Sequence, residues 1–217
     1  MTVSRRAFAL SAFALSASGL VGASALPAMA QSGSGLSAAD RALVDQAVGY
    51  FQSMNAAQGD FIETGPGGQQ FRGRFWLQRP GRMRFEYTQP QGLLVVADGS
   101  NLNRYDPRLN VFRQAPLSAT PLSAFLARDV RLDQTVRVER VTRMANGGFS
   151  MVARSARNPN EGSVTLVFSG SPLRLLEWTV TDAQGQRTRT QLNNLQPARN
   201  LNASLFVLRD PTRRPGR

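Results

Sequence analysis

The sequence predicts a mainly β (α+β) fold, with about ten antiparallel strands in meander order, one long helix in front of them and one short helix inserted midway. Apolar residues recur at helical spacing in one long stretch near residue 40. Beyond that stretch the apolar period changes to two, which is typical of strands with one buried face. Clusters of Gly, Pro, Asn, Asp and Ser separate the strand-like runs and favour turns. A large, curved sheet of this kind would fold around something, and both helices could lie inside its concave face.

The first thirty residues (1–30) are predicted to be a cleaved export signal and not part of the fold. They have a basic start, a long run of Ala, Leu, Phe and small residues, and an A-x-A cleavage site at 28–30. The start at 4–8, SRRAF, is similar to a twin-arginine signal, although ordinary secretory signals also contain paired arginines. Serines and glycines interrupt the apolar run, which argues against a retained membrane helix.

The composition argues against several classes of function. The 217 residues suffice for one domain of ordinary size, expected at 37–211 after a Gly/Ser linker at 31–36 and before a basic tail at 212–217. Because the chain has no cysteine, a hydrophobic core must stabilise the fold without disulfides. Because it has no histidine, it lacks the commonest general base at neutral pH and the commonest zinc ligand. We therefore expect no enzyme activity, no cofactor and no metal.

The formal charge is +12, and every basic residue is an arginine. These arginines are scattered along strand-like segments and do not form one basic stripe, which disfavours nucleic acid as a partner. Outside the cytoplasm, an acidic protein or an anionic membrane surface is the expected counterpart.

The long helix is predicted to begin after Ser37 and to end near Asn55. Ser37 and Asp40 are typical of a capping box, with Leu36 just before it. The apolar residues that follow form one stripe: Leu43, Val44, Ala47, Val48, Phe51 and Met54. This stripe is typical of a core helix, and a lid over a cavity would have the same pattern.

The strands alternate between apolar and polar residues on both sides of a turn at 79–82. The GPGG segment at 65–68 is interpreted as the loop of the preceding hairpin. A short helix is predicted at 122–127, because Thr120 is a suitable cap and Pro121 suits a first helical turn. The strands are expected at 71–78, 82–87, 92–99, 101–107, 111–114, 136–144, 149–154, 164–169, 174–182, 187–193 and 205–208.

A series of short motifs runs through the chain from about residue 39 to residue 211. The motifs are Arg79-Pro80, Phe85-Glu86-Tyr87, Pro90, an apolar strand that ends in Asp98-Gly99, Tyr105-Asp106-Pro107, TPLSAFLA at 120–127 and DAQGQRTRTQLNN at 182–194. No single motif is diagnostic, but their order and spacing together resemble the outer-membrane lipoprotein carrier protein family, the periplasmic LolA chaperones.

The resemblance implies an unclosed antiparallel β-barrel of about ten to eleven strands, with the N-terminal helix and the short inserted helix as a lid over an apolar cavity for acyl chains. It also implies a switching role for Arg79, which matches the arginine of the family's Arg-Pro turn. In the ligand-free form that arginine hydrogen-bonds to backbone carbonyls of the lid helices and holds the cavity closed. A guanidinium offers five donors in a rigid fork, which lysine would not reproduce. The alternative is an ordinary solvated arginine at the end of a hairpin.

The resemblance and the strand alternation together suggest which residues would line the cavity. Candidates from the strands are Phe75, Leu77, Met83, Phe85, Leu94, Val96, Leu166, Phe168, Leu176 and Trp178, and candidates from the lid helix are Val44, Val48 and Phe51. The alternative for each of them is an ordinary place in the core.

The resemblance implies a periplasmic chaperone that binds the acyl chains of lipoproteins released from the inner membrane and carries them to the outer membrane. The expected partners are lipidated proteins as cargo, an inner-membrane ABC lipoprotein-releasing complex and a possible outer-membrane acceptor. The protein is expected to be a monomer. Two alternatives use the same scaffold: a carrier of another lipid, such as a phospholipid or glycolipid, and an envelope regulatory module.

Overall fold

The computed structural model describes residues 35–213, except 121–122, 130–135 and 157–158. The predicted signal at 1–30, most of the predicted linker and the end of the basic tail lie outside the described residues. The compact unit that contains all described residues spans Ser34–Arg217.

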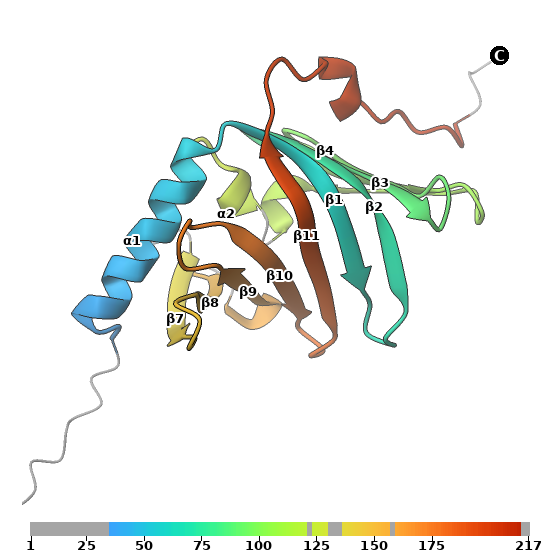
Figure 1. Ribbon diagram of the computed structural model, residues 1–217. Coiled ribbons are helices and arrows are strands. Elements are labelled where there is room, and N and C mark those ends of the chain that lie inside the picture. The colour runs from blue at the N-terminus through green and yellow to red at the C-terminus, as the bar shows by residue number, and fades with distance from the viewer. Residues whose placement is uncertain (1–34, 121–122, 130–135, 157–158, 214–217) are drawn as a thin grey trace, which may run out of the picture. The chain divides into compact units, whose positions relative to one another are not determined.

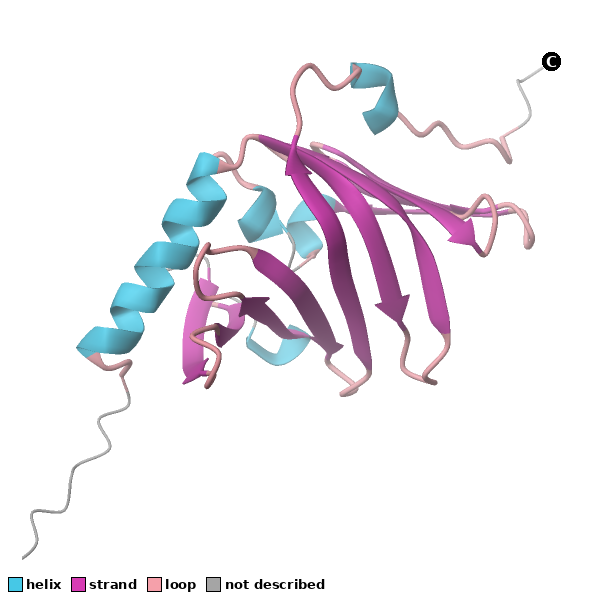
Figure 2. Ribbon diagram, viewed as in Figure 1, coloured by secondary structure: helices cyan, strands magenta, loops and turns pink. Residues whose placement is uncertain are grey.

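Eleven strands form one antiparallel sheet within the described residues (Figures 1 and 2). They are β1 (Ala56–Thr64), β2 (Gln70–Gln78), β3 (Arg82–Gln89), β4 (Leu94–Asp98), β5 (Asn101–Asp106), β6 (Val111–Pro116), β7 (Val136–Arg143), β8 (Phe149–Ser155), β9 (Gly162–Phe168), β10 (Leu175–Asp182) and β11 (Arg187–Pro197). Their order in the sheet is β6-β5-β4-β3-β2-β1-β11-β10-β9-β8-β7. Two runs of hairpins therefore meet at the β1–β11 pair, while β6 and β7 remain as edges. The predicted fold, an unclosed antiparallel barrel, is confirmed.

Helix α1 (Ala38–Ser53) begins where the capping signal predicts. The Ser37 hydroxyl accepts a hydrogen bond from the Asp40 backbone N–H at 3.1 Å and donates one to the Asp40 carboxylate at 2.7 Å. Arg143 of β7 also pairs with Asp40 at 2.8 Å, which fixes the start of the helix against the sheet edge. The buried face of the helix consists of Val44, Ala47 and Phe51, so the predicted apolar stripe is confirmed.

The inserted helix is a short one, α2 (Ser123–Leu126), and it follows the 3-10 turn η1 (Leu117–Ala119). The predicted helix at 122–127 begins on a residue outside the described part of the chain. The Thr120 hydroxyl donates to the Leu117 carbonyl at 2.8 Å and so closes η1. Among the described residues, no helix is long and apolar enough to cross a bilayer. A further 3-10 turn, η2 (Pro159–Glu161), precedes β9.

The predicted strand at 205–208 is wrong, because residues 205–206 belong to the 3-10 turn η3 (Ala203–Phe206) and residues 207–208 have no regular secondary structure. The Asn202 side chain accepts a hydrogen bond from the Ser204 N–H at 2.9 Å, which starts the turn. Arg84 of β3 donates to the Leu205 carbonyl at 3.2 Å, and Phe206 is buried. The turn η3 therefore covers β3 and β4 and does not extend the sheet.

Two apolar clusters form the core. The first contains α1, Phe125 of α2 and the strands β7 to β10, and the Phe51 ring lies 5.5 Å from Phe125 and 5.8 Å from Phe168 between centroids. The second contains strands β1 to β5 around Phe61 and Phe85, whose ring centroids are 4.7 Å apart. Trp178 and Leu192 pack against both clusters, so they mark the place where the clusters meet.

Candidate functional site: an apolar cavity between two helices and the sheet

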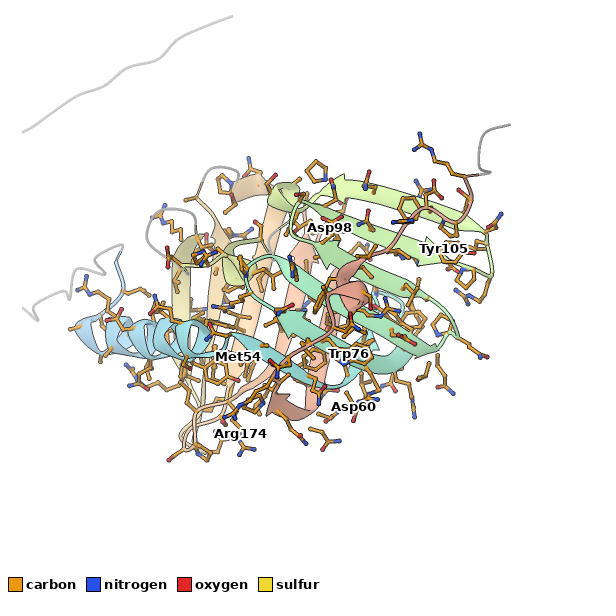
Figure 3. All side chains as sticks on the ribbon, turned by 90° about the horizontal axis from the view of Figure 1, so that it is seen from above. Met54, Asp60, Trp76, Asp98, Tyr105 and Arg174 are labelled. Carbon is orange, nitrogen blue, oxygen red and sulfur yellow. The ribbon has the colours of Figure 1, made fainter. Side chains whose placement is uncertain are left out.

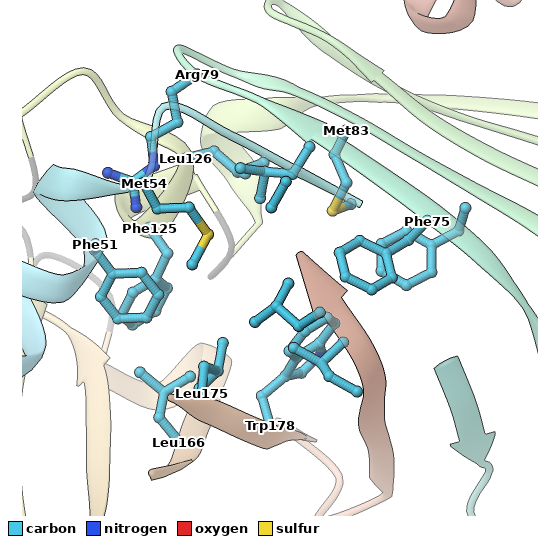
Figure 4. A pocket seen from close by; sticks show the side chains of 15 residues that line it. Phe51, Met54, Phe75, Arg79, Met83, Phe125, Leu126, Leu166, Leu175 and Trp178 are labelled. Atoms are coloured by element: carbon cyan, nitrogen blue, oxygen red, sulfur yellow. The ribbon is translucent and has the colours of Figure 1, made fainter. Parts of the chain in front are cut away.

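A cavity of about 60 Å³ lies where the two clusters meet (Figure 4). Its wall combines the end of α1, Phe125 and Leu126 of α2 and strands from both halves of the sheet. Among the described residues that line it, all are apolar except Arg79. The lining residues are Phe51, Met54, Ala57, Phe75, Leu77, Arg79, Met83, Phe85, Phe125, Leu126, Leu166, Leu175, Trp178, Leu192 and Leu195.

Most of the residues that the sequence nominated for the cavity lie in this wall: Phe51, Phe75, Leu77, Met83, Phe85, Leu166 and Trp178, together with Arg79. Three others, Val44, Val48 and Phe168, pack in the first cluster, nearer the middle of α1. Phe168 is fully buried there and stacks on Phe149 with ring centroids 5.0 Å apart, so it has no face left for the cavity.

The prediction for Leu94 and Val96 is corrected, because these residues lie on the opposite face of the sheet. Val96 is the register partner of Arg84, whose guanidinium reaches η3 on the outer face. The neighbouring pair, Val95 and Phe85, packs in the second cluster. Val96 is nevertheless fully buried, since its face of β4 is the one against which η3 lies.

The prediction for Leu176 is also corrected, and a β-bulge is the reason. The register between β9 and β10 shifts between Leu175 and Glu177. Because a bulge adds one residue to a strand, Leu175 and Trp178 face the cavity although they are three residues apart. Leu176 is left 41% exposed.

A second bulge has the same effect on β11. Between β1 and β11 the register shifts at Gln58 and Asp60, where Gly59 lies. A Cβ at Gly59 would come within 2.8 Å of the Asn193 carbonyl oxygen, so this close approach requires glycine. The bulge brings both Leu192 and Leu195 into the cavity wall at a spacing of three.

The remaining unpredicted wall residues come from segments that alternation does not describe. Met54 and Ala57 lie at the junction of α1 and β1, while Phe125 and Leu126 form part of α2. The TPLSAFLA motif indicated a lid helix, and its apolar residues Phe125 and Leu126 could have been added to the list from that signal.

The turn that contains Arg79 binds both helical segments through its backbone. The Arg79 N–H donates to the carbonyl of Asn55, just after α1, at 2.8 Å. The Gly81 N–H donates to the carbonyl of Leu126, at the end of α2, at 2.7 Å. Gly81 has a φ of +71°, a conformation that favours glycine. The turn therefore joins the sheet to the ends of both helices.

The Arg79 side chain makes a different contact from the one that the resemblance implies. Its guanidinium carbon lies 5.5 Å from the centroid of the Phe51 ring on α1, which is a cation–π distance. Its Nε and Nη1 atoms are buried and have no hydrogen-bond partner in the described part of the chain. Burial consequently lowers the pKa of Arg79.

A partly buried pair of polar side chains lies in the second cluster, away from the cavity wall. The Tyr87 hydroxyl donates to the Glu63 carboxylate at 2.9 Å, and burial raises the pKa of both groups. Phe61 contacts the Tyr87 ring with centroids 4.9 Å apart. The pair is part of the packing and does not line the cavity.

An unclosed barrel with an apolar cavity beneath helical segments defines a class of binding proteins for apolar ligands. The family model described as "Outer membrane lipoprotein carrier protein LolA" matches residues 52–209. The chain therefore belongs to the outer-membrane lipoprotein carrier protein family, which consists of carriers and not enzymes.

Several relatives carry the same description, outer-membrane lipoprotein carrier protein. The protein from Bordetella avium is 30% identical over 77% of this chain and 83% of its own length. The protein from Methylibium petroleiphilum is 27% identical over 77% of this chain and 85% of its own length. Among solved structures, an uncharacterized conserved protein from Thermus thermophilus matches 80% of this chain and 96% of its own, with a TM-score of 0.48 and 15% identity.

Proposed function

We propose that this protein is a periplasmic chaperone that binds the acyl chains of lipoproteins released from the inner membrane and carries them to the outer membrane. The observation that carries the proposal is the cavity wall, whose described residues are apolar except for Arg79. Membership of the lipoprotein carrier family supports the same ligand class.

The energetics of transfer explain why such a carrier needs an apolar cavity. Each methylene group of an acyl chain costs about 0.8 kcal/mol to expose to water. A protein with two or three long acyl chains therefore cannot cross an aqueous compartment unaided. A wall without fixed polar partners binds such chains by area alone, so it can accept chains of different length and then release them.

The described form is closed, because the cavity is too small for an acyl chain. Its volume of about 60 Å³ compares with roughly 300–1,000 Å³ for typical ligand pockets. Binding therefore requires α1 and α2 to move away from the sheet. The contacts to be broken are the Phe51 ring packing and the two backbone hydrogen bonds of the Arg79 turn.

Arg79 is proposed to act as the switch between the closed and the occupied form. Its contact with Phe51 is specific to the closed form, since Phe51 moves away with α1. In the occupied form the guanidinium remains as one polar group at the wall of an otherwise apolar site, where it packs against an acyl chain less favourably than an apolar side chain would. Both effects favour the release of cargo over its retention.

The proposed partners follow from this route: lipidated proteins as cargo, an inner-membrane ABC lipoprotein-releasing complex as donor and an outer-membrane acceptor. Export by the predicted signal at 1–30 would place the mature chain in the periplasm. The carrier is proposed to act there as a monomer. The alternative function, transport of a phospholipid or glycolipid, uses the same cavity and differs in the headgroup that remains outside.

The test is a release assay. Spheroplasts or proteoliposomes that contain the releasing complex and a labelled lipoprotein are incubated with the mature protein, and soluble one-to-one complex is counted. Soluble complex is the expected result. If none forms and native mass spectrometry instead finds a free phospholipid or glycolipid in the cavity, the alternative function replaces the proposed one.

A further inference from the structure

Strands β10 and β11 diverge at one end. They pair with each other from Glu177 with Gln191 to Thr181 with Arg187. Beyond Gln191, the described pairings of β11 are with β1 alone, as far as Pro197. The first residue of β10, Leu175, pairs with Phe168 of β9. The sheet is therefore split between the start of β10 and the end of β11, and Figure 1 shows the two strands turning apart there.

A groove of about 510 Å³ occupies this split. It is several times larger than the cavity beneath the helices and is open to solvent. Leu176 and Gln196 line it from the outer side, on β10 and β11 respectively. Arg174, which is labelled in Figure 3, is exposed at its rim.

The groove and the cavity are neighbours, because Leu175, Leu192 and Leu195 line both. One layer of leucine side chains therefore separates the outside of the sheet from the inside of the cavity. Backbone pairing does not hold this layer shut, since the described pairs between β10 and β11 end at Glu177 and Gln191. Rotation of these side chains would join the two spaces without loss of a sheet hydrogen bond.

We infer that this split is the route by which an acyl chain passes into and out of the cavity, an inference that rests on the function proposed above. Leu176 supports it, because this apolar side chain lines the groove and is 41% exposed, so the apolar path continues from the cavity wall to solvent. The two bulges described above support it as well, since they turn Leu175 and Leu195 inward at the level of the split.

The lid is coupled to this route. Tyr50 on α1 packs against the first cluster, which contains Leu175, and its ring lies 5.9 Å from that of Phe168 between centroids. Movement of α1 therefore frees the β10 side of the split at the same time as it enlarges the cavity. A chain that leaves through the split keeps its polar head outside while its apolar part is buried.

An added peptide strand is the competing occupant, since an unpaired edge attracts strands. The free edge of β11 is poorly suited to it. Asn194 has a φ of 52°, which departs from strand geometry, and Pro197 has no N–H to donate. An acyl chain requires neither regular backbone geometry nor hydrogen bonds, so the apolar occupant fits the split better.

The test blocks the groove and measures whether an acyl chain still enters the cavity. The chain has no cysteine and two tryptophans, so a single cysteine can be labelled uniquely, and a Trp76→Phe background leaves Trp178 in the cavity wall as the reporter. The probe is a synthetic triacylated cysteinyl peptide with brominated chains, which quenches Trp178 when a chain reaches the cavity. Leu176→Cys is labelled with a bulky maleimide dye, and Leu109→Cys, at a residue 68% exposed and outside the groove, is the matched control.

The expected result is a fall in the quenching rate of about tenfold or more after labelling of Leu176→Cys, with no such change for labelled Leu109→Cys. Gln196→Cys, on the β11 side of the split, repeats the test independently of Leu176. Equal rates with and without the label at both groove positions would overturn the route and leave the proposed function standing. Absence of quenching in the unlabelled proteins would overturn the proposed function, and the route with it. A groove dye that responds to an unlipidated peptide and not to the triacylated probe would assign the split to a partner strand and refute the inference.

Discussion

Replacement of Phe51 by alanine should loosen the lid selectively. The Phe51 side chain is 5% exposed and contacts Phe125 of α2, Phe168 of β9 and the Arg79 guanidinium. Truncation of a buried Phe costs about 3–5 kcal/mol. All of these contacts join α1 to its surroundings, so the loss falls on the equilibrium between the closed lid and the open lid.

Native-state hydrogen exchange measures this equilibrium directly. A loss of about 3–5 kcal/mol corresponds to an increase in lid opening of roughly 10²–10⁴-fold. Amides of α1 should lose protection by that factor in Phe51→Ala, while amides of β2 and β3 should change much less. A faster association with an apolar probe should accompany the change, because the open form is more populated.

Phe61→Ala is the matched control, because Phe61 is equally buried but belongs to the second cluster. Its contacts with Phe85 and Tyr87 lie within the sheet, so its loss should reduce protection in β1 to β3 and leave the opening of α1 unchanged. Equal loss of protection in α1 and in the sheet for Phe51→Ala would refute the idea that the lid opens as a separate unit.

Three further predictions concern binding, release and acid stability. Arg79→Leu should bind cargo but fail to pass it on, with release slower by roughly 10–100-fold. The reason is that a Leu buried against the acyl chain adds about 1.5–3 kcal/mol to the free energy of binding. Unchanged transfer to an acceptor membrane would contradict the proposed role of Arg79 as a switch. Leu166→Arg should abolish quenching by the brominated probe, whereas Val167→Arg, at the next residue of β9 and outside the cavity wall, should retain it; equal quenching would exclude this cavity as the site. The Asp106 carboxylate accepts hydrogen bonds from Arg108 at 3.0 and 3.2 Å, and these bonds hold its pKa below the ordinary value. Its contribution to stability is therefore present at neutral pH and is lost as the pH falls through the lowered pKa. Asp106→Asn should lower the melting temperature at pH 7 by several degrees, and the difference from the unchanged protein should shrink on acidification. A difference in melting temperature that does not change with pH would contradict this.

The helix and the general fold class could be predicted because local signals determine them. Ser37 and Asp40 mark the start of α1 by a hydrogen bond between near neighbours in the chain. The period of two identifies strands for the same reason, since each residue contributes independently to the pattern. The unclosed barrel required more than periodicity, because the β1–β11 pair joins residues more than a hundred positions apart. It was the order of motifs, through the family resemblance, that predicted it.

The composition of the cavity wall was less predictable, because bulges and covering segments override alternation. A strict period of two places Leu176 with Trp178, but the bulge at Leu175 reverses that assignment. Val96 has the apolar character of a core residue, and its burial beneath η3 depends on a contact between β4 and the end of the chain. Neither effect leaves a local signature that is stronger than the alternation it interrupts.

The energetics at Arg79 explain how one lid can be both closed and easy to displace. In the closed form the cation–π contact with Phe51 contributes up to about 2 kcal/mol, since the site is partly desolvated. The unpaired Nε and Nη1 atoms oppose it, because each buried donor without a partner costs about 1–3 kcal/mol. Together these terms give no net stabilisation of the closed form, so the burial of Phe51 and the backbone bonds of the turn must hold the lid closed. The arginine is then a residue that adds little to the stability of the empty carrier but keeps the occupied cavity from becoming wholly apolar. A carrier must release its cargo, and a polar group that is costly to bury in both forms keeps the free-energy difference between the closed and the occupied form small.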